Sequence, residues 1–233
     1  MKTPRWIKEI AAVIYPDLCH VCNRSLVDGE SALCLECLAS MPRTGLQHHA
    51  EFNDIHRRVA GHAPIDRAAA YFHYDRDSGY SRLIHHAKYG SHPGLARKLG
   101  ARCADEFNRD HFFDGIDIIE PVPLHWWKQL RRGYNQSHEI ALGISSVTGI
   151  PVASHLSARH HSSQTRLTAA SRRSNATGTY SASDCSAIDG LHILIVDDII
   201  TTGSTMNSCA AALHDMAPRS TISLLAMGLA RLS

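Results

Sequence analysis

The chain has 233 residues, of which 44% are hydrophobic and 20% are charged, as is ordinary for a globular protein with a sizeable core. Its 24 basic and 22 acidic side chains nearly balance, so the net charge does not indicate a nucleic-acid-binding protein. No stretch approaches the roughly 18 apolar residues of a membrane span, and residues 1–14 lack the apolar run of a secretory signal, so we expect a cytoplasmic protein.

Four of the seven cysteines form a regular pattern near the N-terminus. They make two CxxC pairs separated by eleven residues: Cys19, Cys22, Cys34 and Cys37. Two thiolates spaced in this way can reach one ion from a tight turn, and two facing pairs supply the four sulfur ligands that Zn²⁺ prefers in structural sites. The turn signal Asp28-Gly29 would bring the chain back between the pairs. We therefore predict a small zinc-ribbon-like module over residues 1–42.

The role of this metal is expected to be structural. A closed site of four thiolates has no open coordination position, so the ion would stabilise a segment that is too short to have a hydrophobic core. An iron–sulfur cluster or a redox-active cysteine pair is the alternative interpretation of the same spacing.

The next part of the chain is harder to interpret. Residues 41–65 are polar and show no clear periodicity, whereas residues 68–74 form an apolar and aromatic run that predicts a strand. We expect residues 43–115 to form a linker and a hood-like segment. Two helices are predicted within it from the spacing of their apolar residues, which are Tyr80, Leu83, Ile84 and Ala87 in the first and Leu95, Leu99, Cys103 and Phe107 in the second.

From residue 116 onward, predicted strands and helices alternate. This order implies an α/β fold in which helices flank a parallel sheet, over residues 116–233. A helix through Ile140 and Ile144 is expected to end at Gly149, and another begins near Met206. The expected strands are the apolar runs at 116–122, 150–153, 191–196 and 222–229.

The segment ILIVDDIITTGST at 193–205 carries the strongest functional signal. A buried strand is followed by two acids, Asp197 and Asp198, and then by a short loop that opens into a helix. Ligands bind at the carboxyl ends of strands in open parallel sheets, and the N–H groups of a helix N-terminus hold phosphate. Gly203 would let the backbone approach the anion. The expected phosphate cradle consists of Thr201, Thr202, Gly203, Ser204 and Thr205.

The acid pair requires a second group on the same ligand, because carboxylates repel phosphate unless they face hydroxyls or a cation. Ribose 5-phosphate meets this requirement if its 2- and 3-hydroxyls lie against Asp197 and Asp198. The carboxylates would then also favour positive charge at the anomeric carbon. The alternative is a solvated Asp-Asp turn before a capped helix. The chain lacks the Walker A pattern, which argues against a P-loop nucleotidase.

This segment resembles the phosphoribosyl-pyrophosphate signature of type I phosphoribosyltransferases. The whole chain resembles the ComF family, whose members join a four-cysteine N-terminal module to such a domain. The resemblance implies a type I phosphoribosyltransferase-like sheet and a site for phosphoribosyl pyrophosphate with Mg²⁺. The chain departs from the family pattern at residues 43–65, where some relatives carry further cysteine pairs. Family-like patterns recur at residues 88–90, 121–125, 132–136, 164–167 and 172–175.

Further candidates for binding the pyrophosphate are basic. Arg131 and Arg132 precede a helix and offer planar guanidinium groups that match phosphate oxygens, although a solvated basic turn is the alternative. Lys88 could reach the same anion or remain a surface lysine. Arg159 begins a polar stretch, 159–179, that resembles the family's catalytic lid, and it would act with the acid pair; a disordered linker is the alternative.

Two functions are consistent with these features. The first is phosphoribosyl transfer to an acceptor that the sequence does not identify. The second is a non-catalytic or regulatory role in natural competence, because the ComF family is associated with the handling of incoming single-stranded DNA. Trp126 and Trp127 lie beside basic residues and could stack on bases, although such a pair also serves as packing. The expected partners are phosphoribosyl pyrophosphate and, for the second function, single-stranded DNA and the competence machinery.

Overall fold

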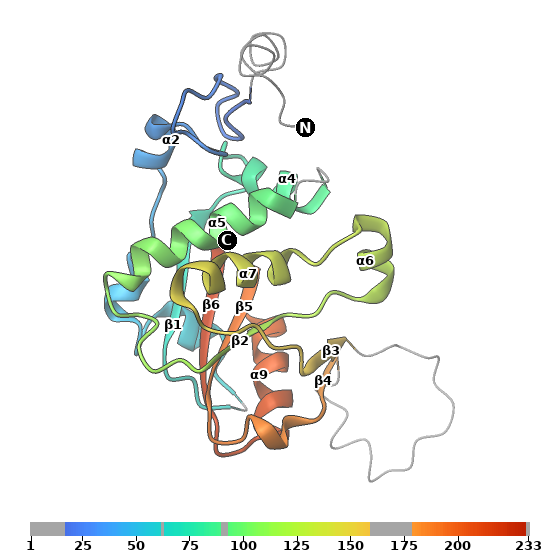
Figure 1. The fold of residues 1–233 in the computed structure, drawn as a ribbon. Helices are drawn as coiled ribbons and strands as arrows, with labels where there is room; N and C mark the ends of the chain where they lie inside the picture. Colours follow the sequence, from blue (N-terminus) through green and yellow to red (C-terminus); the bar gives the residue numbers. More distant parts are fainter. Residues whose placement is uncertain (1–16, 62, 90–92, 159–178, 232–233) are drawn as a thin grey trace.

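The centre of the molecule is a four-stranded parallel sheet (Figure 1). The computed structural model describes residues 17–61, 63–89, 93–158 and 179–231. Every neighbouring pair of strands is parallel, which confirms the expected α/β fold with a parallel sheet. In spatial order the strands are β1 (Ala68–Tyr74), β6 (Thr221–Ala230), β5 (His192–Ile200) and β2 (Ile118–Pro121).

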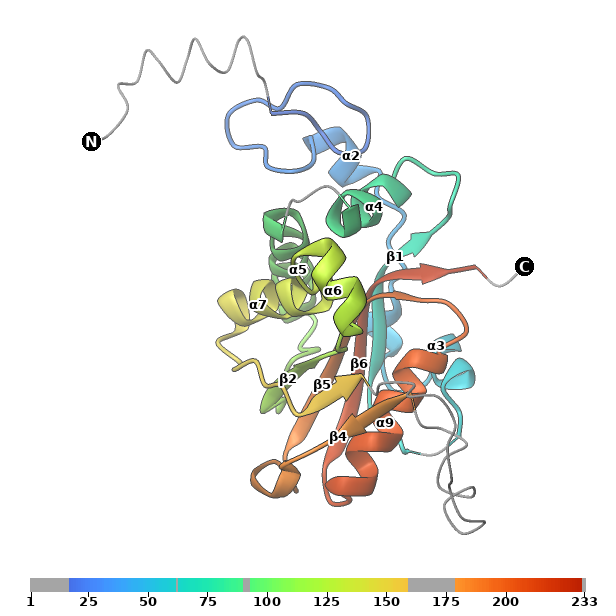
Figure 2. The ribbon, with the colours of Figure 1, turned by 90° about the vertical axis from the view of Figure 1, so that its right-hand side faces the viewer.

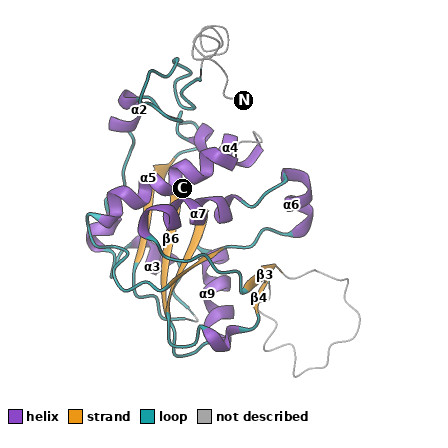
Figure 3. Ribbon diagram, viewed as in Figure 1, coloured by secondary structure: helices purple, strands orange, loops and turns teal. Residues whose placement is uncertain are grey.

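Helices cover both faces of this sheet (Figures 2 and 3). Side chains of β5 alternate between two hydrophobic cores, so that Leu194 and Val196 pack on one face while Ile193 and Ile195 pack on the other. A strand that is covered on both faces is apolar at every position, which explains the continuous run in the sequence. The first face carries α4 (Ser81–Tyr89), α5 (Pro93–Asn108) and α7 (Gln136–Thr148), and the second carries α3 (Asp54–Arg58) and α9 (Ser204–Met216).

Helices α5 and α7 approach closely because each presents a glycine to the other. A Cβ atom at Gly100 would lie 2.2 Å from the carbonyl oxygen of Ile140, and a Cβ atom at Gly143 would lie 2.1 Å from that of Arg97. Neither position can hold a side chain unless the helices separate. The two glycines therefore set the position of α7, whose N-terminal end reaches the candidate site.

The remaining elements are short and lie around the sheet. Strands β3 and β4 pair in an antiparallel manner on either side of residues 159–178. Apart from Thr179, the expected polar loop therefore lies outside the described residues. None of the helices in the described ranges is long and apolar enough to cross a membrane. The short elements are α2 (Leu35–Ala39), η1 (Leu46–His49), α6 (Trp126–Arg132), β3 (Leu156–Ala158), β4 (Tyr180–Ala182) and η2 (Cys185–Ala187).

The structure corrects two of the predicted strands. The strand expected at 191–196 continues to Ile200, because β6 pairs with it that far. The strand expected at 150–153 is reduced to a single bridge between Val152 and Ile119. Residues 43–115, expected as a linker and hood-like segment, supply β1 to the central sheet and α4 and α5 to the helical layer on one of its faces. The division of the chain at residue 116 stays a prediction.

Candidate functional site

Asp197 and Asp198 lie within β5 rather than after it. The pairing of β5 with β2 ends at Val196, whose carbonyl accepts from the N–H of Val122, while the pairing with β6 continues to Ile200. One edge of β5 is therefore open beyond Val196. The longer strand thus carries both carboxylates past the carboxyl end of its neighbour, which is where ligands bind in open parallel sheets.

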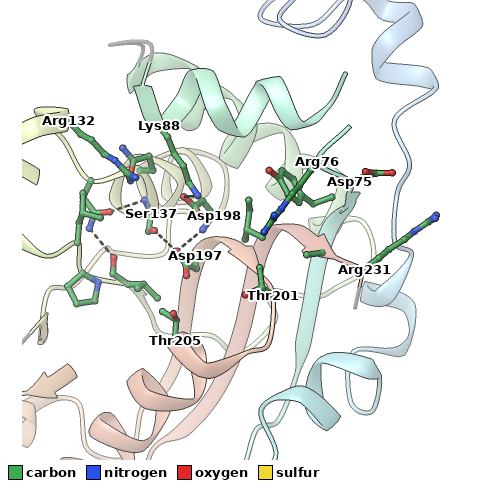
Figure 4. Close-up of a pocket in the computed structure, with 18 of the residues that line it drawn as sticks. Asp75, Arg76, Lys88, Arg132, Ser137, Asp197, Asp198, Thr201, Thr205 and Arg231 are labelled. Carbon is green, nitrogen blue, oxygen red and sulfur yellow. Dashed lines mark hydrogen bonds and ion pairs between the residues drawn. The ribbon is translucent and has the colours of Figure 1, made fainter. Parts of the chain in front are cut away.

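Asp197 is held in place by two hydrogen bonds to one of its oxygens (Figure 4). Ser137 Oγ donates to Asp197 Oδ1 at 2.9 Å, and the backbone N–H of Asp198 donates to the same oxygen at 2.8 Å. Burial raises the pKa of Asp197 to about 7, and the charge of Asp198 adds to the rise, while these hydrogen bonds and Lys88 oppose it. This carboxyl group therefore changes its protonation near neutral pH.

Asp198 pairs with the lysine that the sequence singled out. Lys88 Nζ lies 3.1 Å from Asp198 Oδ2, and the two side chains are only 23% and 15% exposed. Lys88 comes from the C-terminal end of α4, which is also tied to the core because the hydroxyl of Tyr134 donates to the carbonyl of Ala87. The structure places Lys88 beside Asp198, and a contact of Lys88 with an anion of the ligand stays a prediction.

The loop at 201–203 is supported from behind by α3. Arg58 Nη1 donates to the carbonyl of Thr201 at 2.8 Å and to that of Ala230 at 2.7 Å, which ties the loop to the end of β6. Gly203 has φ +82°, and a Cβ atom there would lie 3.0 Å from the carbonyl oxygen of Arg58. The glycine is thus required by its left-handed backbone and by the closeness of α3. That Gly203 also lets the backbone approach an anion stays a prediction.

A cavity of about 870 Å³ lies over this end of the sheet (Figure 4). Both acids, Lys88, Thr201 and Thr205 line it. The hydroxyls of Thr202 and Ser204 are 3.3 Å apart, and neither residue lines this cavity. The structure therefore brings together the acid pair and two of the five predicted cradle residues. The volume is in the range of small-molecule sites.

The two candidate arginines differ in position. Both lie in the last turn of α6, which ends at Arg132 and is capped by Gly133 with φ +81°, so they belong to one helix and also precede the next. Arg132 lines the cavity and donates to Gln136 Oε1 at 2.8 Å. Arg131 is exposed and does not line it. Arg159, the remaining candidate, lies outside the described residues.

Several residues that support the site were not identified from the sequence. Asn135 caps α7 by accepting from the N–H of Ser137 and donates to the carbonyl of Val122, which joins the helix to the end of β2. Glu120 is fully buried in β2 and accepts from the N–H groups of His155 and Leu156, which anchors the start of β3. Asn135 falls inside a family-like pattern, so it could have been found, but no local pattern marks Glu120.

The four cysteines of the expected metal module converge. All four Sγ atoms lie within 4.8 Å of one another, and those of Cys22 and Cys34 are 3.8 Å apart. Zn–S bonds of about 2.3 Å in a tetrahedron place sulfur atoms roughly 3.8 Å apart, so the cluster fits one zinc ion. Gly29 adopts φ +88° in the turn between the pairs, as its sequence predicted. The cluster could hold a metal, and its identity as zinc is a prediction.

We expect purified protein to contain one zinc ion per chain and Cys34→Ser to lose it. The substitution removes one of four ligands and should loosen the segment up to Met41, while circular dichroism shows the α/β domain still folded. Cys185→Ser is the matched control, because Cys185 is a buried cysteine in η2 that lies outside the group of four possible metal ligands found among the described residues. Zinc retained by Cys34→Ser, or an iron–sulfur absorption spectrum of the wild type, would contradict the assignment.

The raised pKa of Asp197 predicts a pH-dependent stability. Between the ordinary value of 3.8 and about 7 the folded state holds a proton that the unfolded state has released, so stability falls as pH rises through this window. Asparagine mimics the protonated acid. The difference in melting temperature between Asp197→Asn and the wild type should therefore shift in favour of the variant from pH 4 to pH 7 and stay constant above pH 7. Thermal unfolding at several pH values measures this difference, and a difference that does not change with pH would refute the prediction.

Sequence comparison identifies the kind of domain. The phosphoribosyl transferase domain family matches residues 123–228. Competence protein F of Haemophilus influenzae is 34% identical over 125 residues, which are 52% of this chain and 54% of that protein, so the chain spans about half the length of this relative. DNA utilization protein YhgH of Escherichia coli (strain K12) is 27% identical over 210 residues, which are 85% of this chain and 91% of that protein.

Two solved structures are similar over part of the chain. One is the allosteric regulatory enzyme of purine biosynthesis, with 22% identity and a TM-score of 0.42. The other is glutamine phosphoribosylpyrophosphate amidotransferase from B. subtilis complexed with ADP and GMP, with 21% identity and a TM-score of 0.41. Each match covers 60% of this chain and 30% of the solved chain. The matched domain and the two sequence relatives together support the interpretation of this chain as a phosphoribosyltransferase-like protein of the ComF family.

Proposed function

We propose that the cavity binds phosphoribosyl pyrophosphate with Mg²⁺ and that the protein transfers the phosphoribosyl group to an acceptor. The observation that carries this proposal is that the residues lining one cavity at the carboxyl end of β5 include the acid pair, Thr201 and Thr205, and the basic side chains of Lys88 and Arg132. A sugar phosphate has matching groups, because it joins an anion to hydroxyls. The phosphoribosyl transferase domain matched over residues 123–228 supports the same ligand.

Each part of the ligand has a candidate partner in the cavity. The 5-phosphate would lie at Thr201 and Thr205, near the N-terminus of α9, a helix of 13 residues whose first N–H groups and dipole favour an anion. The ribose hydroxyls would face Asp197 and Asp198. The pyrophosphate would lie toward Arg132, whose planar guanidinium can donate to two oxygens at once.

The reaction breaks the bond between the anomeric carbon and pyrophosphate and forms a bond from the acceptor to that carbon. The carboxylates of Asp197 and Asp198 favour the positive charge that develops on the sugar. Asp197 and Asp198 would hold Mg²⁺, and the bound ion would supply positive charge that neutralises the pyrophosphate leaving group. Carboxylate oxygens are ligands of the kind that Mg²⁺ prefers, so the acid pair fits this ion. Arg159 is proposed to add positive charge from the segment that follows β3.

Calorimetry with phosphoribosyl pyrophosphate and Mg²⁺ tests the site. We expect binding by the wild type, weaker binding of ribose 5-phosphate at the same place, and a loss of about tenfold or more in Asp198→Asn, because hydrogen bonds to charged groups contribute about 1.5–3 kcal/mol. Asp189→Asn is the matched control, since Asp189 pairs with Arg219 at 2.8 Å and does not line the cavity. Unchanged binding in both Asp197→Asn and Asp198→Asn would show that the ligand lies elsewhere.

A second function, the handling of single-stranded DNA, is favoured by the exposure of α6. Trp127 is 60% exposed and Leu130 is 71% exposed, on a helix that projects from the side of the molecule (Figure 1). An exposed aromatic ring next to basic side chains can stack on bases. The names of the two sequence relatives refer to competence and to DNA utilization. We propose that α6 contacts a DNA strand next to the cavity.

The positions of the two arginines make this proposal testable. Arg131→Glu should weaken binding of single-stranded DNA but leave the affinity for phosphoribosyl pyrophosphate intact, whereas Arg132→Glu should weaken both. Trp127→Ala should cost about 1–3 kcal/mol of DNA affinity if the ring stacks on one base. Fluorescence anisotropy of a labelled oligonucleotide, titrated with salt and with phosphoribosyl pyrophosphate, measures these effects. Strong DNA binding that is indifferent to Trp127→Ala would place the strand on another surface.

A further inference from the structure

The cysteine module is attached to the beginning of α4. The hydroxyl of Tyr80 donates to the carbonyl of Cys37 at 2.8 Å, and Arg82 Nη1 donates to the carbonyl of Val21 at 3.2 Å. A Cβ atom at Gly79 would lie 3.0 Å from Val21 Cγ1, so the two segments are in close contact. Both acceptors lie within the CxxC pairs, so a change in the backbone of these pairs would move the acceptors of both hydrogen bonds.

The other end of the same helix reaches the acid pair. Lys88 Nζ lies 3.1 Å from Asp198 Oδ2, and the neighbouring carbonyl of Ala87 accepts from Tyr134. Helix α4 has nine residues, or about 13 Å of rise, and buries Leu83 and Ile84 against the core. A short helix held in this way moves as a unit, so a shift at its first turn also shifts Lys88.

The position of Lys88 bears on the charge of the cavity. Two neighbouring carboxylates would repel an anionic ligand, and the ammonium group at 3.1 Å offsets part of that repulsion. The interaction between charges falls with distance, so displacement of Lys88 should weaken the binding of an anion.

We infer that Tyr80 and Arg82 are positioning residues through which the cysteine module sets the place of Lys88 beside Asp198, and thereby the affinity of the cavity for a sugar pyrophosphate. The inference rests on the proposed function for its ligand. It gives the module a role beyond its own folding, because the module is coupled to the site through a helix that touches both.

A double-mutant cycle tests this coupling in the full-length protein. Tyr80→Phe/Arg82→Gln removes the hydroxyl and the guanidinium group that make these hydrogen bonds but no cysteine, so metal analysis should find the zinc content of the wild type. Calorimetry with phosphoribosyl pyrophosphate and Mg²⁺ should show a loss of about fivefold or more, the lower range of coupling between sites. In a Lys88→Ala background the same pair of substitutions should cause no further loss, since the effect passes through Lys88.

Tyr71→Phe is the matched control. It also removes a buried hydroxyl that donates a hydrogen bond, to Glu106 at 2.6 Å, but Tyr71 lies in β1 and makes that bond to α5. The control should lose stability without losing affinity. Equal losses of affinity in Tyr80→Phe/Arg82→Gln with and without Lys88, or no loss at all, would overturn the inference.

A measurement without ligand separates this inference from the proposed function. The rate at which acetic anhydride acetylates Lys88, followed by mass spectrometry, should rise by about twofold or more in Tyr80→Phe/Arg82→Gln, because an amine released from its ion pair reacts faster. If the wild type bound no phosphoribosyl pyrophosphate but acetylation rose, the coupling would stand and the ligand would be wrong. An unchanged acetylation rate would refute the coupling whatever the ligand.

Discussion

Two adjacent carboxylates at the end of a buried strand are the constraint around which the site is organised. Side chains of successive strand residues point to opposite faces, yet both acids line one cavity because the strand has lost its neighbour on one edge. Burial and the neighbouring charge of Asp198 oppose the ionisation of Asp197, and the raised pKa of Asp197 reflects that cost. Ser137 and Lys88 reduce it from two different helices. The end of β5 therefore requires α7 and α4 to lie where they do, and the glycine contact between α5 and α7 makes that position attainable.

The opposite side of the site depends on a contact between distant segments. Arg58 donates to two carbonyls at the ends of two neighbouring parallel strands, and its own carbonyl leaves no room for a side chain at position 203. The loop before α9 is thus held by α3, while Thr201 at its start lines the cavity. A phosphate cradle gains from this arrangement, because N–H groups that are already oriented lose less conformational entropy when an anion binds.

Local patterns predicted the sheet and the acid pair well. The apolar run at 193–196, the acids and the loop before α9 follow one another in the chain, so strand, site and helix could all be inferred from one segment. The bounds of β5 could not be inferred, because they depend on how far β6 continues to pair with it. Arg58 and Ser137 could not be identified for a related reason. Each acts on a residue that is distant in sequence, and neither lies in a pattern that specifies its partner.

The packing of the cysteine module could not be predicted from its sequence either. Its spacing predicted a self-contained unit, since four thiolates can stabilise a short segment without a core. In the structure, Cys19, Cys34 and Cys37 belong to the same buried cluster as Leu83 and Leu95 of the helical layer. A metal held by the four cysteines would give this unit a rigid surface, because it would fix the backbone at four points in addition to these apolar contacts. Helix α4 lies against that surface at its first turn and against the acid pair at its last. The short helix therefore joins the cysteine module to the acid pair, although none of the described module residues lines the cavity.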